Sequence, residues 1–326
     1  MTPDRALVVD GLTELIGAPV TITGAASVGA QRSTLFVDID RGSTTEAAVA
    51  QISGTVIESR PATVEAELIA LAETAGVPVP TVHAVTDHLP GVGAPAMVVS
   101  RAEGRTIPRH VIRGVQTPAD GDALAHQCGT ALARLHAIPR DSVPAAVDTT
   151  LSDTFTDLQE QRLDLLPAPH PAIRFGIAWL RAHPVDDPAP ALVHGDFRNG
   201  NIVVDDRGLV AVLDWEVAQV SDPMQDLAWL CLRTWRFGSD HRPVGGFGSF
   251  EALIDGYRSA GGTYREDAFR WWSIARSVWW AIGLAGQAAA FTSGLTDAIV
   301  LAASGRRVPE LEHDLLTLIR LSEQEH

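Results

Sequence analysis

Residues 192–201 read Leu-Val-His-Gly-Asp-Phe-Arg-Asn-Gly-Asn, and residues 212–216 read Val-Leu-Asp-Trp-Glu. In the first stretch an apolar run leads into Asp196 on a tight loop, and Asn201 follows five residues later. Asp214 comes thirteen residues after Asn201, at the end of the next expected hairpin. Phosphoryl transfer needs such a set: a carboxylate beside the acceptor hydroxyl, and oxygen ligands for Mg²⁺ on the transferred phosphate. Oxygen ligands without His or Cys clusters favour magnesium over zinc.

This pattern resembles the His-Gly-Asp-x-x-x-x-Asn loop and the following metal-binding Asp of the aminoglycoside phosphotransferase-like small-molecule kinases. The resemblance implies that Asp196 is the catalytic base, that His194 shapes its loop, and that Asn201 and Asp214 bind Mg²⁺. Arg198 lies where protein kinases carry a Lys that contacts the transferred phosphate, so it would stabilise the developing charge. The alternative for Arg198 is a surface salt bridge. The expected cofactors are ATP, or another nucleoside triphosphate, and Mg²⁺.

The order of expected elements fits the two-lobed, α+β fold of these kinases. Short β-prone runs separated by Gly, Pro, Asp and Thr fill the first hundred residues, around one helical pattern at 62–74. The rest of the chain is mostly helical, apart from a short hairpin at 201–213. We therefore expect a small β-rich nucleotide-binding lobe at 1–103 and a large, mostly helical catalytic and substrate-binding lobe at 104–326. The expected strands are 20–23, 35–39, 47–52, 79–85 and 96–100, and the expected later helices are 119–137, 151–166, 171–182, 223–235, 250–260, 265–291 and 310–323.

The resemblance also implies a nucleotide site in the first lobe. Residues 29–34 fall where the family has its nucleotide-covering loop, so Gly29, Gln31 and Arg32 are candidate nucleotide-binding residues. Residues 96–104 are similar to the family's hinge between lobes, where backbone groups of Ser100 and Ala102 would bind adenine.

One departure from the family concerns the third strand, which normally carries a Lys or Arg that grips the phosphates and pairs with a helix Glu. Gln51 takes that place here, and Glu65 is the expected helix partner, with Glu67 as the alternative. Three explanations remain open. Arg32 or Arg60 supplies the missing charge, nucleotide affinity is weak, or the protein is a nucleotide-binding pseudokinase or scaffold. We favour compensation because the base and the metal ligands are intact.

Composition limits the partners. The 326 residues carry 25 basic and 40 acidic side chains, a net charge of −15, so nucleic acid and anionic membrane surfaces are poor partners. All the basic residues are arginine, which excludes chemistry that needs a lysine amine. Two distant cysteines, no visible secretory signal and no long uncharged apolar run favour a cytoplasmic protein. The sequence does not determine the oligomeric state.

The acceptor is the least determined part of the interpretation. Residues 214–248 are most similar to the kinase domains associated with acyl-CoA dehydrogenases, which implies phosphorylation of a hydroxyl on a hydroxyacyl-CoA. Arg233 and Arg236 could then meet the phosphates of such a CoA thioester. Tryptophans in the late helices either line an acyl pocket or simply fill the core: Trp271, Trp272, Trp279 and Trp280. The alternative acceptor is an aminoglycoside-type antibiotic.

Overall fold

The computed structural model describes residues 4–28, 32–54, 60–187 and 189–324, and they form two compact units. The first unit comprises residues 1–105, 138–147 and 201–217, and the second comprises 106–137, 148–200 and 218–326. Residues 201–217, which include Asn201 and Asp214, therefore belong to the first unit. The boundary expected from the sequence, after residue 103, would place them in the second lobe. No helix of the described stretches is long and apolar enough to cross a membrane.

A five-stranded antiparallel sheet with order β1-β2-β3-β5-β4 forms the centre of the first unit. Alternation along β2 and β3 directs Val37, Ile39, Ala48 and Ala50 into one core with α1, because successive strand side chains point to opposite faces. The strands and helices are β1 Val20–Val28, β2 Arg32–Asp40, β3 Thr45–Ser53, β4 Val82–Thr86, β5 Ala96–Ser100, α1 Arg5–Ile16 and α2 Ala62–Thr74.

Helix α1 was not expected from the sequence, whereas α2 has the predicted bounds. The start of α1 is capped by the Asp4 carboxylate, which accepts a hydrogen bond from the N–H of Ala6. Gly17 ends α1 in the left-handed conformation. The first unit also contains the hairpin β7 Ile202–Asp205 and β8 Gly208–Val212, and the short turn η1 Arg140–Ser142.

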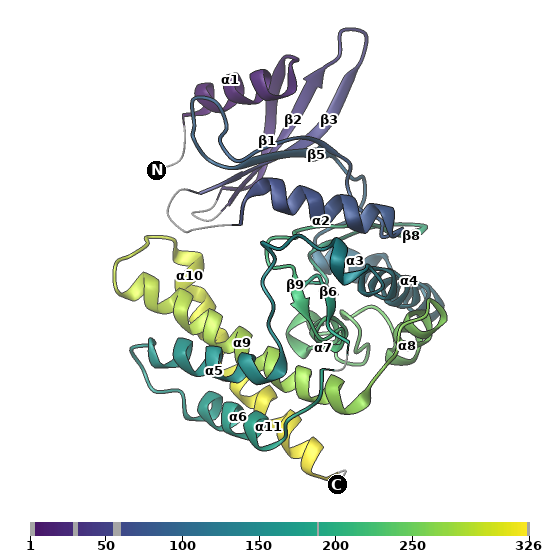
Figure 1. Ribbon diagram of the computed structural model, residues 1–326, viewed down its shortest axis with the longest axis vertical. Coiled ribbons are helices and arrows are strands. Elements are labelled where there is room, and N and C mark those ends of the chain that lie inside the picture. Colours follow the sequence, from purple (N-terminus) through teal and green to yellow (C-terminus); the bar gives the residue numbers. More distant parts are fainter. Residues whose placement is uncertain (1–3, 29–31, 55–59, 188, 325–326) are drawn as a thin grey trace. The chain divides into compact units, whose positions relative to one another are not determined.

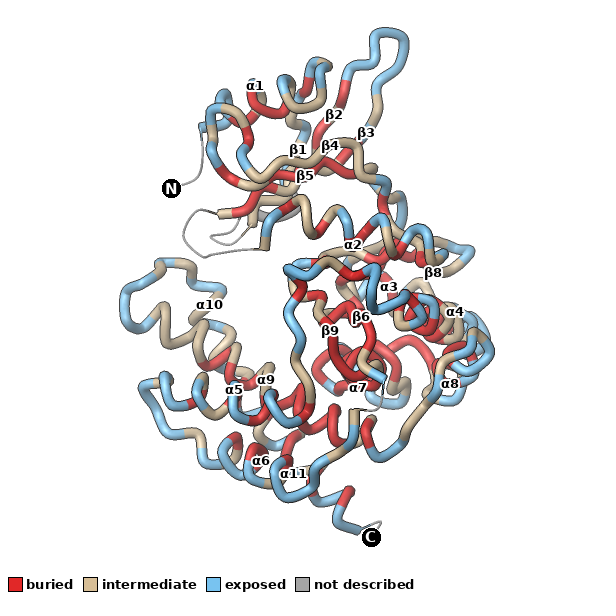
Figure 2. The backbone as a smooth tube through the Cα atoms, viewed as in Figure 1, coloured by how far each residue is buried: buried red, intermediate tan, exposed pale blue. Residues whose placement is uncertain are grey.

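The second unit is helical, as predicted, and has one small sheet of β6 Ala191–Val193 with β9 Gln219–Ser221. Its central helix is α7 Met224–Cys231, every residue of which is buried, and Figure 2 shows this segment in red. The remaining elements, most of them visible in Figure 1, are α3 Pro108–Gly114, α4 Pro118–His136, α5 Ser152–Asp164, α6 Pro171–Ala182, η2 Arg233–Trp235, α8 Phe250–Ser259, α9 Glu266–Thr292, α10 Ile299–Ser304, η3 Gly305–Arg307 and α11 Val308–Gln324.

Close helix packing explains two glycines of this unit. A Cβ added at Gly129 of α4 would come within 2.1 Å of the Leu253 carbonyl oxygen, and one at Gly256 of α8 within 2.0 Å of the His126 carbonyl oxygen. The backbones of α4 and α8 therefore touch where only hydrogen fits between them.

Trp271 and Trp272 of α9 pack edge-on against Phe155 and are buried, so these two tryptophans fill the core and do not line an acyl pocket.

Candidate active site

A buried carboxylate of α7 anchors the loop that follows β6. Asp226 on α7 is fully buried, and its two oxygens accept hydrogen bonds from the backbone N–H of His194 at 2.7 Å and of Gly195 at 2.8 Å. The loop turns at Gly195, whose φ of 75° suits a residue without a side chain. Asp226 therefore fixes the peptide units on either side of His194, just before Asp196.

The charge of Asp226 is balanced within the same unit. Nε2 of His136 lies 3.2 Å from the carboxylate, and Tyr257 contacts the other ring nitrogen at 3.0 Å. Burial by itself would raise the pKa of Asp226, but the hydrogen bond and charge of His136, with His194, outweigh it and lower that pKa. Asp226 consequently stays ionised and acts as a fixed acceptor for the loop.

His194 is also fully buried and shapes the loop through its ring. Its Nδ1 accepts a hydrogen bond from the backbone N–H of Asp196 at 3.1 Å, and the ring packs edge-on against Phe197. An accepting Nδ1 carries no proton, so this contact requires the tautomer protonated on Nε2. His194 thus orients the backbone on which the Asp196 carboxylate is carried.

The Asp196 carboxylate is partly open and is held by two donors. Nε of Arg198 lies 3.0 Å and 3.2 Å from its two oxygens, and the indole N–H of Trp229 donates to Oδ1 at 2.7 Å. The side chains of Asp196 and Arg198 are 17% and 23% exposed, so each has room to meet a ligand. Both contacts hold the carboxylate in one orientation, which a base or orienting group requires.

A buried arginine supports this arrangement. Arg276 of α9 is 2% exposed, and its guanidinium donates to the Gly195 carbonyl oxygen at 2.5 Å. The same guanidinium lies 4.4 Å from the ring centroid of Trp229 and 4.0 Å from that of Trp279. Burial lowers the pKa of Arg276 to about 10, against the opposing effect of the Asp196 and Asp226 charges. The guanidinium therefore remains charged at neutral pH, where it braces both the loop backbone and the indole that touches Asp196.

Asn201 and Asp214, the expected magnesium ligands, lie together in the first unit. The Leu213 N–H donates to the Asn201 carbonyl oxygen at 2.8 Å, which places Asp214 one residue beyond that contact. Asp214 has a φ of 67°, an unusual backbone conformation for a residue with a side chain, and its side chain is 36% exposed. An amide oxygen and a carboxylate suit Mg²⁺, which commonly takes one or two protein ligands and completes its shell with phosphate and water. Asn201 and Asp214 therefore fit the ion that the sequence predicts.

Arg32 of β2, rather than Gln51 of β3, pairs with Glu65 of α2. Its Nη1 and Nη2 donate to the two Glu65 oxygens at 3.0 Å and 2.5 Å, and the side chains are 15% and 2% exposed. Thr34 is paired with Gln51 in the β2–β3 register, so Arg32 projects from the same sheet face as Gln51 and reaches α2. The role of Gln51 itself stays a prediction.

The environment of Arg32 is strongly acidic. Its guanidinium also lies 3.7 Å from Asp214 and 3.9 Å from Glu216. Burial by itself would lower the pKa of Arg32, but the hydrogen bonds and charge of Glu65, with Glu216 and Asp214, outweigh it and raise that pKa. A permanent cation therefore lies beside the Asp214 carboxylate. Arg60, the other candidate for compensation, donates to the Trp215 carbonyl oxygen at 3.3 Å.

The remaining nucleotide-site expectations have mixed outcomes. Gly29 and Gln31 lie outside the described residues. The N–H of Ser100 donates to the Thr81 carbonyl oxygen at 2.8 Å, so this N–H is not available to adenine. Ala102 follows β5 in irregular structure. Adenine binding by the backbone of Ser100, other than through its N–H, and by the backbone of Ala102 stays a prediction.

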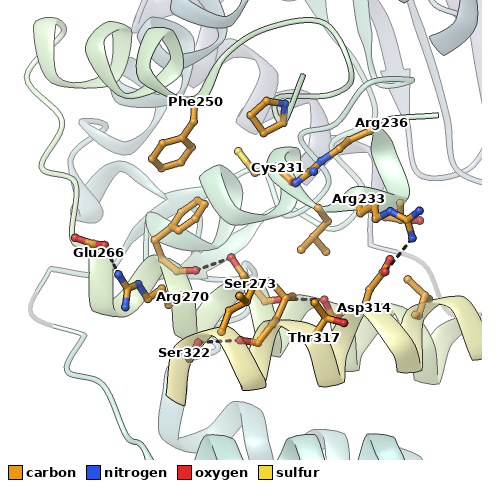
Figure 3. Close-up of a pocket in the computed structure, with 18 of the residues that line it drawn as sticks. Cys231, Arg233, Arg236, Phe250, Glu266, Arg270, Ser273, Asp314, Thr317 and Ser322 are labelled. Atoms are coloured by element: carbon orange, nitrogen blue, oxygen red, sulfur yellow. Dashed lines mark hydrogen bonds and ion pairs between the residues drawn. The ribbon is translucent and has the colours of Figure 1, made fainter. Parts of the chain in front are cut away.

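Arg233 and Arg236, expected to contact the substrate, are engaged by the protein itself. Arg233 forms ion pairs with Asp240 and Asp314, each at 3.1 Å, and Arg236 donates to the Cys231 carbonyl oxygen at 2.8 Å. Both line a cavity of about 520 Å³ between η2, α9 and α11, where Figure 3 shows Arg233 reaching Asp314. Because these guanidinium groups already have acceptors, the expectation that they bind CoA phosphates is not supported.

Two residues of the site were missed by the sequence analysis, Trp229 and Arg276. Trp229 follows Asp226 by three positions, a spacing that puts both on the same face of α7 toward the loop. That spacing could have identified Trp229 once Asp226 was taken as the anchor. Arg276 stands alone among apolar residues in a helix, a signal that a buried charge has a specific acceptor.

Residues 25–263 match the phosphotransferase enzyme family, and this range includes the loop around Asp196, the hairpin with Asp214 and the Arg32–Glu65 pair. The chain belongs to the phosphotransferase enzyme family. Membership confirms the small-molecule kinase that the sequence predicted, and the β-rich and helical units confirm the predicted α+β class.

Relatives of this phosphotransferase include mouse (Mus musculus) acyl-CoA dehydrogenase family member 10, 29% identical over 55% of the chain. Homoserine kinase of Methylobacterium radiotolerans is 30% identical over 51% of the chain. The aligned stretches span 17% of the mouse protein and 49% of the homoserine kinase. Among solved structures, spectinomycin phosphotransferase in complex with ADP and spectinomycin is similar over 97% of this chain and 99% of its own, with a TM-score of 0.66 and 12% identity. That likeness shows a shared fold.

Proposed function

We propose that this phosphotransferase transfers the terminal phosphoryl group of ATP, or of another nucleoside triphosphate, to a hydroxyl group of a small molecule. The observation that carries the proposal is the Asp196 carboxylate, partly exposed, held by Arg198 and Trp229 on a loop pinned by Asp226. Such a carboxylate can orient an acceptor hydroxyl and take its proton as the oxygen attacks phosphorus. Nucleotide use is supported by the ADP bound in the structurally similar spectinomycin phosphotransferase.

The other residues would bind and neutralise the phosphates. Asn201 and Asp214 would hold Mg²⁺, which when bound would neutralise charge on the phosphate oxygens. Arg32 would supply the phosphate-gripping cation that is missing at Gln51, with Glu65 fixing its orientation. Arg198 would stabilise charge on the transferred group, as its place beside Asp196 favours. An intact base and a compensating arginine favour an active kinase over a pseudokinase.

The test is ATP turnover measured by ADP release, first with water as acceptor and then with an acceptor panel. The panel contains homoserine, on which a relative is named to act, spectinomycin, and hydroxyacyl-CoA thioesters. Asp196→Asn should lower turnover by at least ~10²-fold, the lower range for losing a positioned base. Asp206→Asn, an exposed carboxylate on the β7–β8 turn, is the matched control and should leave turnover unchanged.

Binding is measured separately as the rise in melting temperature with ATP and Mg²⁺. Asp196→Asn should retain that rise, because Asp196 acts on the acceptor hydroxyl. If ADP release is unaffected by the substitution, Asp196 is not the base. If the wild type shows no rise and no turnover with any acceptor, the scaffold alternative replaces the proposal.

A further inference from the structure

Two buried tryptophans join the loop of Asp196 to further aromatic side chains of the second unit. The Trp229 indole N–H donates to Asp196 at 2.7 Å, and the Trp229 ring centroid lies 4.9 Å from that of Trp235. Both indoles are buried, Trp229 completely and Trp235 at 4% exposed. The side chains that contact these two indoles and are themselves at least partly exposed are called the aromatic patch: Phe237, Trp279 and Trp280.

The aromatic patch lies one indole ring away from the Asp196 carboxylate. The ring centroids of Trp279 and Trp280 are 5.5 Å and 5.9 Å from that of Trp229. Trp279 and Trp280 are stacked at 21° to each other, and Trp229 meets both edge-on. Because one edge of Trp229 bonds Asp196 while its ring touches the stacked pair, a small molecule can reach from the carboxylate to the patch.

Arg198 forms a second connection between the carboxylate and the aromatic patch. Its Nε lies 3.0 Å from Asp196, and its Cζ lies 4.4 Å from the ring centroid of Trp235. Phe237 contacts the same indole at 6.4 Å and is 38% exposed. All of these residues belong to the second unit. The candidate base and the exposed apolar rings are therefore parts of one surface region that these contacts hold together.

Two features keep apolar ring surface of the patch open to solvent at a cost in stability. Phe237 has a φ of 48°, a left-handed conformation that a bulky residue rarely adopts. Gly283 follows Trp279 by one turn of α9, and glycine inside a helix is less favourable than alanine. A Cβ added at Gly283 would lie 3.7 Å from Cε3 of Trp280, an ordinary contact, so the packing of the described residues does not require glycine there.

The charges beside these rings disfavour a cationic ligand. Aromatic faces attract cations, but a guanidinium already lies over three of them. Arg198 lies over Trp235, and the Arg276 guanidinium lies 4.4 Å from the ring centroid of Trp229 and 4.0 Å from that of Trp279. An ammonium group placed beside the patch would meet the charge of both arginines. Uncharged apolar groups meet no such repulsion and gain from covering the exposed rings.

We propose that the aromatic patch binds the acceptor, so that the physiological acceptor carries an apolar skeleton, an alkyl chain or an aromatic ring, next to the hydroxyl that Asp196 orients. This inference rests on the proposed function, since it names the acceptor class of the same active site. An apolar skeleton would remove the open faces of Phe237, Trp279 and Trp280 from water. A polyol placed there would lose hydrogen bonds to water against rings that cannot replace them.

The experiment compares acceptors by ADP release. Primary alcohols from ethanol to 1-octanol form the alkyl series, and benzyl alcohol and 2-phenylethanol form the aromatic series. Glycerol and sorbitol are the polar counterparts of 1-propanol and 1-hexanol, and spectinomycin is the cationic acceptor. We expect kcat/KM to rise about fourfold per added methylene until the patch is covered, the effect of burying one CH2 group. The two series show whether a chain or a ring fits better.

Two substitutions test the patch without removing a buried side chain. Gly283→Gln should raise KM for the preferred alcohol about 3- to 10-fold, with a much smaller change in kcat and no fall in melting temperature, because glutamine covers Trp280 and favours the helix. Phe237→Ala should raise the same KM about 3- to 10-fold. The controls should leave KM unchanged: Gly286→Gln, where an added Cβ lies 3.9 Å from Leu166, and Phe175→Ala on α6, which is 53% exposed.

Several outcomes would overturn the inference. They are a kcat/KM independent of chain length, a preference for glycerol, sorbitol or spectinomycin, a series in which no alcohol is phosphorylated, and a KM unchanged in both patch variants. A purely structural role of the patch would lower kcat for polar and apolar acceptors alike, which also contradicts the inference. ATP hydrolysis with water as acceptor separates the two proposals. If hydrolysis depends on Asp196 while apolar alcohols are not preferred, only the acceptor class is wrong. If hydrolysis is absent and no acceptor is phosphorylated, the kinase proposal itself fails.

Discussion

Removing Arg32 from the Arg32–Glu65 pair should destabilise the protein more than removing Arg32 and Glu65 together. The two side chains are 15% and 2% exposed and share two hydrogen bonds of 3.0 Å and 2.5 Å. Arg32→Met would leave the Glu65 carboxylate buried without that cation, which should lower the free energy of unfolding by about 3–5 kcal/mol. Glu65→Leu should cost less, about 1–2 kcal/mol, because Arg32 keeps Asp214 at 3.7 Å and Glu216 at 3.9 Å.

The double variant Arg32→Met/Glu65→Leu replaces the pair by apolar side chains and leaves no unpaired charge of either partner. Its cost should therefore be smaller than the sum of the two single costs by at least about 2 kcal/mol. Urea unfolding followed by circular dichroism gives the four free energies of this cycle. The double variant should also bind ATP and Mg²⁺ more weakly, measured as a smaller rise in melting temperature, because it lacks the cation proposed to bind the phosphates.

The matched control is the Arg41–Glu46 pair, which joins the β2–β3 turn to β3 at 3.0 Å but is 39% and 36% exposed. The same cycle on this pair should give a coupling below about 1 kcal/mol, as exposed pairs do. A coupling between Arg32 and Glu65 no larger than that of the control would refute the reasoning. Such a result would mean that the pair is not desolvated and that Glu65 does not hold Arg32 in place.

Two further substitutions test the loop around Asp196. Trp229→Phe keeps the ring but removes the N–H that donates to Asp196 at 2.7 Å, so kcat should fall about 10- to 100-fold, the loss of a charge-assisted hydrogen bond, while Trp179→Phe should leave kcat unchanged. An unchanged kcat in Trp229→Phe would show that this contact does not orient the base. Asp226→Asn should lower the free energy of unfolding by about 3 kcal/mol at pH 7, because the buried carboxylate accepts two backbone N–H groups and contacts His136. The fold lowers the pKa of Asp226, so the ionised carboxylate adds to the free energy of unfolding above about pH 4, the ordinary pKa of Asp. This stabilisation is lost as the pH falls through the lower pKa of Asp226 in the folded protein. The gap between wild type and variant, measured by urea unfolding, should therefore narrow below that pH, and a gap that widens on acidification would contradict the assignment.

Local sequence was sufficient wherever neighbouring residues decide the structure. The helices at 62–74 and 171–182 have the predicted bounds, because their periodicity and end residues act within one or two turns. The sequence did not reveal α10 of the second unit, a short helix without buried residues. In such a segment no apolar stripe marks the helix.

The loop motif around Asp196 identified the family from sequence alone and predicted which carboxylate is the base, because the spacing of Asp196 and Asn201 is set within one short loop. What surrounds that carboxylate depends on packing between distant segments. The β2–β3 register brings Arg32 to Glu65, and the packing of α7 beneath the loop brings the Trp229 indole to Asp196. Residue types and short spacings determined which chemistry the chain carries. Only the tertiary structure decided which charges are paired, because pairing depends on burial and on contacts between residues that are far apart in the sequence.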